Sequence, residues 1–195
     1  MRDFVKVNIP GSVLDVGCGT GEHLKALVNI VPFQSVGIDV STKMLKIAIK
    51  KIRGKAQLVR ASMYYLPFRS DSFDVAISLG PTVATKRPAL EEIHRVSRND
   101  GHLFMDFHNA LSPFAWVYLL GSIFQNFSGS FALETPWSVR KIFISEGFAI
   151  VRWSSCMLTP VWSGPISERG WSPFRFLGAL LLAEFRTLKG AEKPG

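Results

Sequence analysis

The chain has 195 residues, of which 47% are hydrophobic and 19% are charged. This length allows one domain with a sizeable hydrophobic core, and the composition excludes an intrinsically disordered protein. The formal net charge of +8 permits nucleic acid, an anionic membrane or an acidic substrate as a partner, although solubility alone accounts for such a charge.

Two features of the sequence concern the compartment. Its two cysteines are Cys18 and Cys156, and Cys18 lies in a glycine-rich segment, so a structural disulfide is not expected. The first residues do not have the pattern of a signal peptide, and the longest apolar runs are too short to span a bilayer. A cytoplasmic location is therefore expected.

A glycine-rich turn at residues 13–24 is the most informative segment. A short apolar run, three glycines and an amphipathic pattern predict a buried strand, a tight turn and the start of a helix. Gly17, Gly19 and Gly21 allow the backbone to turn sharply and to approach a ligand closely. In open α/β sheets such turns lie beyond the carboxyl ends of the strands, where nucleotide-like ligands bind.

The residues around the turn argue against a dinucleotide. The dinucleotide fingerprint is Gly-x-Gly-x-x-Gly/Ala, and its last position here holds Glu22. Asp15, which precedes the turn, would repel a pyrophosphate but would suit a ligand with an ammonium group.

Apolar periodicity predicts the other elements along the chain. Helices are expected over residues 22–31, 42–52, 88–98 and 137–146, with Ser41 as the cap of the second. Besides the strand that begins at Val13, strands are expected over residues 35–39, 56–59, 75–79, 102–107, 149–158 and 179–188. The last segment also has a helical interpretation, and residues 99–101 form an expected turn.

The string Asp-Val-Gly-Cys-Gly-Thr-Gly at residues 15–21 resembles the first motif of the class I S-adenosylmethionine-dependent methyltransferases. The resemblance extends to about Phe148, within the small-molecule group related to the quinone C-methyltransferases (methyltransferase type 11). It implies an α/β, Rossmann-like, mostly parallel sheet of seven strands with helices on both faces and an antiparallel last strand. Residues 1–195 would then form a single domain, with S-adenosyl-L-methionine as cofactor and S-adenosyl-L-homocysteine as product.

The cofactor residues follow from this resemblance and from spacing. Asp39 lies 22 residues after Gly17, close to the roughly 20 expected for a carboxylate that binds ribose hydroxyls. Ser62 occupies a position where the family usually has an aspartate that binds the adenine amino group, and Met63 can pack on the ring. The expected cofactor residues are Asp15, Gly17, Cys18, Gly19, Gly21, Asp39, Val40, Met44, Ser62, Met63, Leu79 and Gly80.

Expectations for catalysis are narrower. His108 follows the strand at residues 102–107 and is the candidate catalytic residue, whereas His94 is expected to be structural and His23 to lie at the surface. Residues 78–81 differ from the Asn/Asp-Pro-Pro-Tyr/Phe motif of enzymes that methylate nucleobase amino groups. No pair of cysteine and histidine at ligand spacing indicates a metal site.

Two aromatic segments, residues 109–135 and 159–175, are expected to cover the substrate. The first could equally contain an ordinary core helix, or it could rest on a membrane interface as a peripheral contact.

Three functions remain open from the sequence. The first is a methyltransferase that acts on a small, apolar acceptor. The second is an RNA or protein methyltransferase that uses the basic residues Lys43, Lys46, Lys50, Lys51 and Arg53. The third is a cofactor-binding protein without catalytic activity. The sequence does not indicate the oligomeric state.

Overall fold

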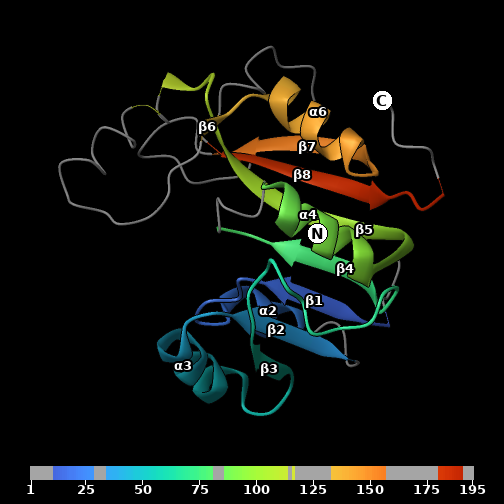
Figure 1. Cartoon of the computed structure of the whole chain (residues 1–195). Coiled ribbons are helices and arrows are strands. Elements are labelled where there is room, and N and C mark those ends of the chain that lie inside the picture. Colours follow the sequence, from blue (N-terminus) through green and yellow to red (C-terminus); the bar gives the residue numbers. More distant parts are fainter. Residues whose placement is uncertain are drawn as a thin grey trace.

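A single mixed β-sheet organises the structure, a computed structural model that describes residues 11–28, 34–80, 86–113, 116, 133–156 and 180–190. The strand order is β3-β2-β1-β4-β5-β8-β7, and β6 pairs with β5 outside this path (Figure 1). The strands are β1 (Val13–Val16), β2 (Ser35–Asp39), β3 (Gln57–Arg60), β4 (Phe73–Ser78), β5 (Ser97–Asn109), β6 (Leu133–Glu134), β7 (Phe148–Cys156) and β8 (Leu180–Thr187).

The sheet changes from parallel to antiparallel pairing at β5. Strands β1 to β5 pair in parallel, so their carboxyl ends meet at one edge of the sheet. Strand β8 runs antiparallel to both β5 and β7. The prediction of a mostly parallel Rossmann-like sheet with an antiparallel last strand is confirmed, and the helical interpretation of residues 179–188 is wrong.

Strand β6 adds an eighth, two-residue strand to the seven that the sequence predicts. Pairing between β4 and β5 ends at Ser78 and Met105, and β6 then pairs with His108 and Asn109 of β5. A two-residue strand carries too little hydrophobic pattern to be predicted from sequence.

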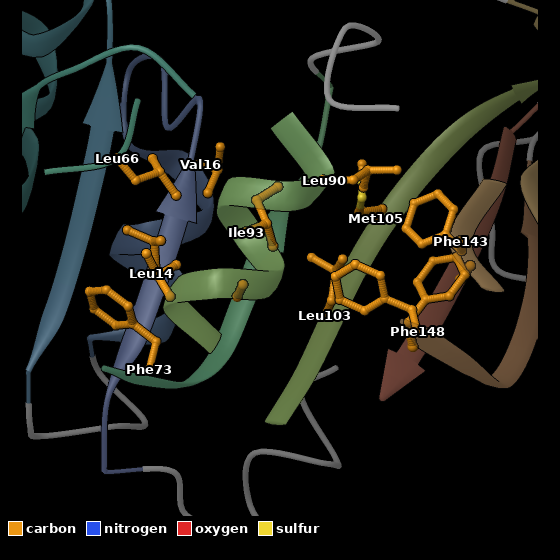
Figure 2. Close-up of a cluster of buried hydrophobic side chains, with 14 of the residues drawn as sticks. Leu14, Val16, Leu66, Phe73, Leu90, Ile93, Leu103, Met105, Phe143 and Phe148 are labelled. Carbon is orange, nitrogen blue, oxygen red and sulfur yellow. The ribbon is translucent and has the colours of Figure 1, made fainter. Parts of the chain in front are cut away.

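Helices α2 (Glu22–Leu27), α3 (Thr42–Ile52), α4 (Arg87–Val96) and α6 (Pro136–Ser145) cover both faces. Because side chains alternate along a strand, the two faces have separate cores. Leu14 and Leu103 pack with α4 and α6 in the largest cluster, where Figure 2 shows side chains from the strands and from α4. Val13 and Phe104 belong to a second cluster, which includes Leu27 of α2.

Two predicted boundaries change in the structure. Helix α2 ends at Leu27, short of the predicted residue 31, and residues 29–33 lie outside the described residues. The turn predicted at residues 99–101 lies within β5, where Asp100 has a φ of 59° and the pairing with β4 shifts register between Phe73 and Val75. Between the pairs Phe73–Ser97 and Val75–His102, β5 advances five residues and β4 two, so the predicted turn is present as an irregularity inside a longer strand.

Most of the two predicted cover segments, residues 109–135 and 159–175, lies outside the described residues. At the start of the first segment, the Trp116 indole Nε1 donates a hydrogen bond to the carbonyl of Ala110 (2.9 Å). Within the described ranges, no helix is both long enough and apolar enough to cross a membrane.

Candidate functional site

The glycine turn joins β1 to α2 at the carboxyl edge of the parallel strands. Gly17, Gly19 and Gly21 have φ angles of 76°, 53° and 76°, a region that side chains rarely adopt. A Cβ on Gly21 would lie 3.0 Å from Ile52 Cδ1 and 3.1 Å from Ala48 Cβ, so this glycine allows α2 to begin against α3. A Cβ on Gly19 would have no described atom within 4 Å, so Gly19 faces open space.

Asp39, the last residue of β2, ties the turn to α3. Its Oδ2 accepts a hydrogen bond from the Gly19 amide (2.9 Å), and its Oδ1 accepts one from the Ser41 amide (2.7 Å). Ser41 caps α3, as predicted, by accepting a hydrogen bond from the Met44 amide (3.3 Å). A carboxylate has about four lone-pair sites, so each oxygen of Asp39 can still accept a hydroxyl of a ligand.

Asp15 is a buried carboxylate beneath the same turn. It is 1% exposed, and its Oδ2 has no hydrogen-bond partner among the described residues. Burial, together with the charge of Asp39, raises the pKa of the Asp15 carboxyl from its ordinary value of 3.8 to about 7. A buried carboxylate of this kind is stabilised by a cation that enters the site, and an ammonium group would satisfy the open oxygen.

The raised pKa predicts a pH-dependent cost to folding. The unfolded chain loses the Asp15 proton near its ordinary pKa of 3.8, whereas the folded chain holds it until about pH 7. Stability should therefore fall as the pH rises between about 4 and 7. Asp15→Asn cannot ionise and should remove this part of the fall, which is on the order of a few kcal/mol. Urea unfolding of both proteins across this pH range tests the expectation, and parallel stability curves would contradict it.

The loop after β3 lies beside Asp39, because the Ala61 amide donates to the Asp39 carbonyl (3.2 Å). In this loop the Ser62 hydroxyl oxygen accepts a hydrogen bond from the Tyr64 amide (3.2 Å), and Met63 packs against the largest core cluster. Val40 and Met44 are exposed by 61% and 41%. The structure thus places these four predicted cofactor residues on the two segments that follow β2 and β3.

Helix α4 fixes the rest of that loop. The Leu66 amide donates to Glu92 Oε2 (2.6 Å), while the Arg95 guanidinium donates to the carbonyls of Phe68 (2.8 Å) and Leu66 (3.0 Å). Arg95 also pairs with Glu92 (2.6 Å). This ion pair therefore has a structural role in holding the loop next to the site.

The segment that follows β4 meets a second carboxylate, that of Asp106 in β5. The amide of Gly80 donates to Asp106 Oδ1 (2.7 Å), and Gly80 has a φ of 93°. Asp106 lies two residues before His108 on the same face of β5. Burial raises the pKa of Asp106, whereas burial lowers the pKa of His108 against the opposing effect of Asp106.

Sequence reasoning missed Asp106. The available signal was a charged residue inside an otherwise apolar stretch, residues 103–107, of a predicted strand. Such a residue needs a polar partner when the strand is buried, and the Gly80 amide supplies one. Leu79, by contrast, was predicted as a cofactor residue, and the structure places it among the residues that line an adjacent cavity.

This cavity has a volume of about 210 Å³ and lies over β5, β8 and β7. Phe104, Glu184 and Arg152 form one cross-strand row of its wall, and Asp106, Leu182 and Ser154 are the next row towards the carboxyl end of β5. Its described lining residues are Leu79, Phe104, Met105, Arg152, Ser154, Leu182, Ala183 and Glu184. The cavity is therefore mainly apolar and borders Asp106.

The polar part of the cavity wall contains the buried carboxylate of Glu184. Glu184 is 3% exposed, accepts a hydrogen bond from Arg152 Nε (2.5 Å) and lies 2.9 Å from His102 Nδ1. These partners satisfy a charge that would otherwise be costly to bury.

Cys18 and His94 lie in surroundings that suit a structural role. Burial and the carboxylates of Asp15 and Asp39 raise the pKa of the Cys18 thiol to about 12, so it remains protonated and is a poor nucleophile. His94 Nε2 lies 3.1 Å from the carbonyl of Leu188, and its ring meets that of Phe148 edge-on. The described residues contain no group of three or more potential metal ligands.

Comparisons with known proteins match this chain to methyltransferases. The family described as "Methyltransferase domain" matches residues 14–105. Demethylmenaquinone methyltransferase of Thermotoga maritima is 30% identical over 173 residues, which cover 75% of this chain and 73% of that protein. An uncharacterized protein of Methanocaldococcus jannaschii is 44% identical over 91 residues, or 46% of this chain and 34% of that protein. The chain spans 34% to 51% of the length of the first three curated relatives it matches.

Solved structures show the same fold at low sequence identity. A methyltransferase of Thermotoga maritima, described as a possible histamine N-methyltransferase, superimposes with a TM-score of 0.73 at 19% identity, covering 96% of this chain and 87% of that one. The putative methyltransferase bound to the Trm112 activator of Haloferax volcanii gives a TM-score of 0.73 at 18% identity, covering 97% and 89%.

Proposed function

Because this chain belongs to the class I S-adenosylmethionine-dependent methyltransferases and takes S-adenosylmethionine as its cofactor, we propose that it methylates a small, apolar acceptor. The reaction would take place at the carboxyl edge of the parallel strands. The observation that carries the donor site is the Asp15 Oδ2 atom, which has no hydrogen-bond partner in the described part of the chain and lies below a turn whose Gly19 faces open space.

Each part of the donor has a matching group in this proposal. Asp15 receives the ammonium group of the methionine moiety, and the glycine turn lets the backbone approach the ligand. Asp39 accepts the ribose hydroxyls with the lone pairs that Gly19 and Ser41 leave open. The adenine ring lies between the segments that follow β2 and β3, where it meets Val40, Met44, Ser62 and Met63.

The chemistry requires little more than positioning. The sulfonium of the cofactor is itself a strong methyl donor, so the protein must align the acceptor atom with the methyl carbon and exclude water. Gly80 and Leu79 lie at the end of β4, next to Asp106. His108, whose pKa is lowered by burial, would be neutral at physiological pH and able to accept a proton from the acceptor.

The size and lining of the cavity support the acceptor class. A cavity of about 150 Å³ holds a benzene molecule, so a volume of about 210 Å³ suits one substituted ring. The row of Asp106, Leu182 and Ser154 leads from this cavity towards His108. The relative of Thermotoga maritima is named for demethylmenaquinone, which also favours an apolar ring as acceptor.

Gly19→Ala should weaken the binding of S-adenosylmethionine about tenfold or more, because the added methyl group enters the space that the ligand needs. Isothermal titration calorimetry with S-adenosylmethionine measures this change. Transfer of labelled methyl groups to a panel of small phenols and naphthols tests the second half of the proposal. Tight binding of the donor without transfer to any of them would favour a cofactor-binding protein without catalytic activity.

Gly190→Ala is a matched control. Gly190 also has a positive φ, 87°, and a Cβ there likewise has no described atom within 4 Å, but it follows β8 and lies far along the chain from the turn. Both substitutions should cost about 1–2 kcal/mol of stability through backbone strain. Equal donor affinity in both variants would overturn the assignment of the turn.

A further inference from the structure

A basic hollow lies where the ends of α2 and α3 meet. Its volume is about 380 Å³, and its described lining residues are Lys25, Val28, Lys50, Lys51, Ile52, Arg53 and Lys55. Five of these seven residues carry a positive charge, and none is acidic. Like charges repel, so a concave cluster of this kind is stabilised when an anion enters it.

Two local interactions offset part of this positive charge. Lys51 Nζ forms an ion pair with Glu22 and a hydrogen bond with Thr20 Oγ1 (3.3 Å). Lys50 and Lys51 occupy the last turn of α3, where cations interact favourably with the helix dipole. Lys25 of α2 and Lys55, beyond the end of α3, line the same hollow.

The positive charge continues along the outer face of α3. Lys43, Lys46 and Lys50 are spaced three and four residues apart, so they lie on one side of the helix, and α3 contains no acidic residue. Its buried residues, Leu45, Ala48 and Ile52, face the opposite side. The hollow and this lysine stripe thus form one extended basic surface.

The apolar residues of α3 do not favour a membrane as the partner. Met44 is 41% exposed, but it belongs to the proposed cofactor site. Ile47 and Ile49 are 43% and 58% exposed, but residues two apart point to nearly opposite sides of a helix. They cannot enter one bilayer surface together, as an interfacial helix requires. An extended row of cations with a recessed end suits a chain of phosphates.

We propose that the hollow binds phosphate groups of a nucleic acid and that the lysine stripe of α3 contacts neighbouring phosphates. This site shares no residue with the proposed cofactor site, so it does not depend on which acceptor is methylated. The recognition is electrostatic and backbone-directed, because the described lining offers cations and no aromatic side chain for base stacking.

The test is binding of a fluorescent single-stranded RNA by anisotropy at several salt concentrations. Lys50→Glu/Arg53→Glu should weaken binding by about tenfold or more at low salt and should reduce the salt slope by about 1 to 2. The neutral pair Lys50→Gln/Arg53→Gln should give an intermediate loss. Calorimetry with S-adenosylmethionine and thermal unfolding verify that each variant is folded.

Arg140→Glu/Lys141→Glu is the matched control, because it makes the same change in net charge on exposed residues of α6, at the opposite end of the sheet from α3 (Figure 1). This variant should keep RNA affinity within about threefold of the wild type. An equal loss in both double variants would overturn the proposal, as would wild-type protein that does not retain RNA. Loss of binding to phosphatidylserine vesicles in the hollow variant, with RNA binding intact, would assign the surface to a membrane instead.

Discussion

Asp39→Ala should weaken the binding of S-adenosylmethionine by about 2–3 kcal/mol, which corresponds to a change in Kd of roughly 30- to 150-fold. The proposed site gives this carboxylate two tasks, and alanine removes both. The variant would lose the hydrogen bonds between Asp39 and the ribose hydroxyls, which the negative charge of the carboxylate strengthens. It would also release the glycine turn, because the Gly19 amide donates to Asp39 in the folded chain (2.9 Å).

The second task makes the expected loss larger than the direct contacts alone would give. The Ser41 amide also depends on Asp39 (2.7 Å), so the variant frees the start of α3 as well. A turn that must be ordered when the ligand binds lowers affinity through its entropy. We therefore expect a less favourable binding entropy in calorimetry, together with a small loss of thermal stability.

Two further variants separate the tasks. Glu91→Ala removes one exposed negative charge from α4 and should leave the donor affinity unchanged, which controls for net charge. Asp39→Asn keeps one oxygen for the backbone but places an amide nitrogen against the other N–H donor, so it should lose nearly as much affinity as alanine. Unchanged affinity in Asp39→Ala would refute the role of this residue in ribose binding.

The fold could be predicted where the local pattern was strong. Three glycines between a buried strand and an amphipathic helix specified the first turn, and Ser41 specified the start of α3 because a serine can cap the free amides of a helix. The start of β5 was harder to predict from the sequence. Residues 99–101 have turn chemistry, and only pairing with β4 on both sides of that turn makes it part of a longer strand.

Individual residues of the candidate site could be predicted from the sequence, but the contacts that join them could not. Periodicity put Asp39 and Gly80 at strand ends, and parallel pairing then brings those ends to one edge of the sheet. The hydrogen bond between the Gly80 amide and Asp106 joins residues 26 apart in sequence, and no local sequence pattern predicts it. The same holds for the basic hollow, where Lys25 and Lys55 meet through helix packing.

Phe143→Ala should destabilise the fold by about 3–5 kcal/mol, a large part of the total stability of a domain of this size. Phe143 of α6 is fully buried and stacks on Phe185 of β8, with ring centroids 3.9 Å apart. It also meets Phe107 of β5 edge-on, at 5.7 Å, and Phe107 lies between Asp106 and His108. Because the cavity left by the ring would loosen this end of β5, methyl transfer should decline more than donor affinity.

Denaturant unfolding measures the destabilisation, and Trp137→Ala is the control. Trp137 is on the same helix but 68% exposed, and its removal should cost under about 0.5 kcal/mol. Equal losses in the two variants would mean that α6 is not anchored to the sheet through Phe143.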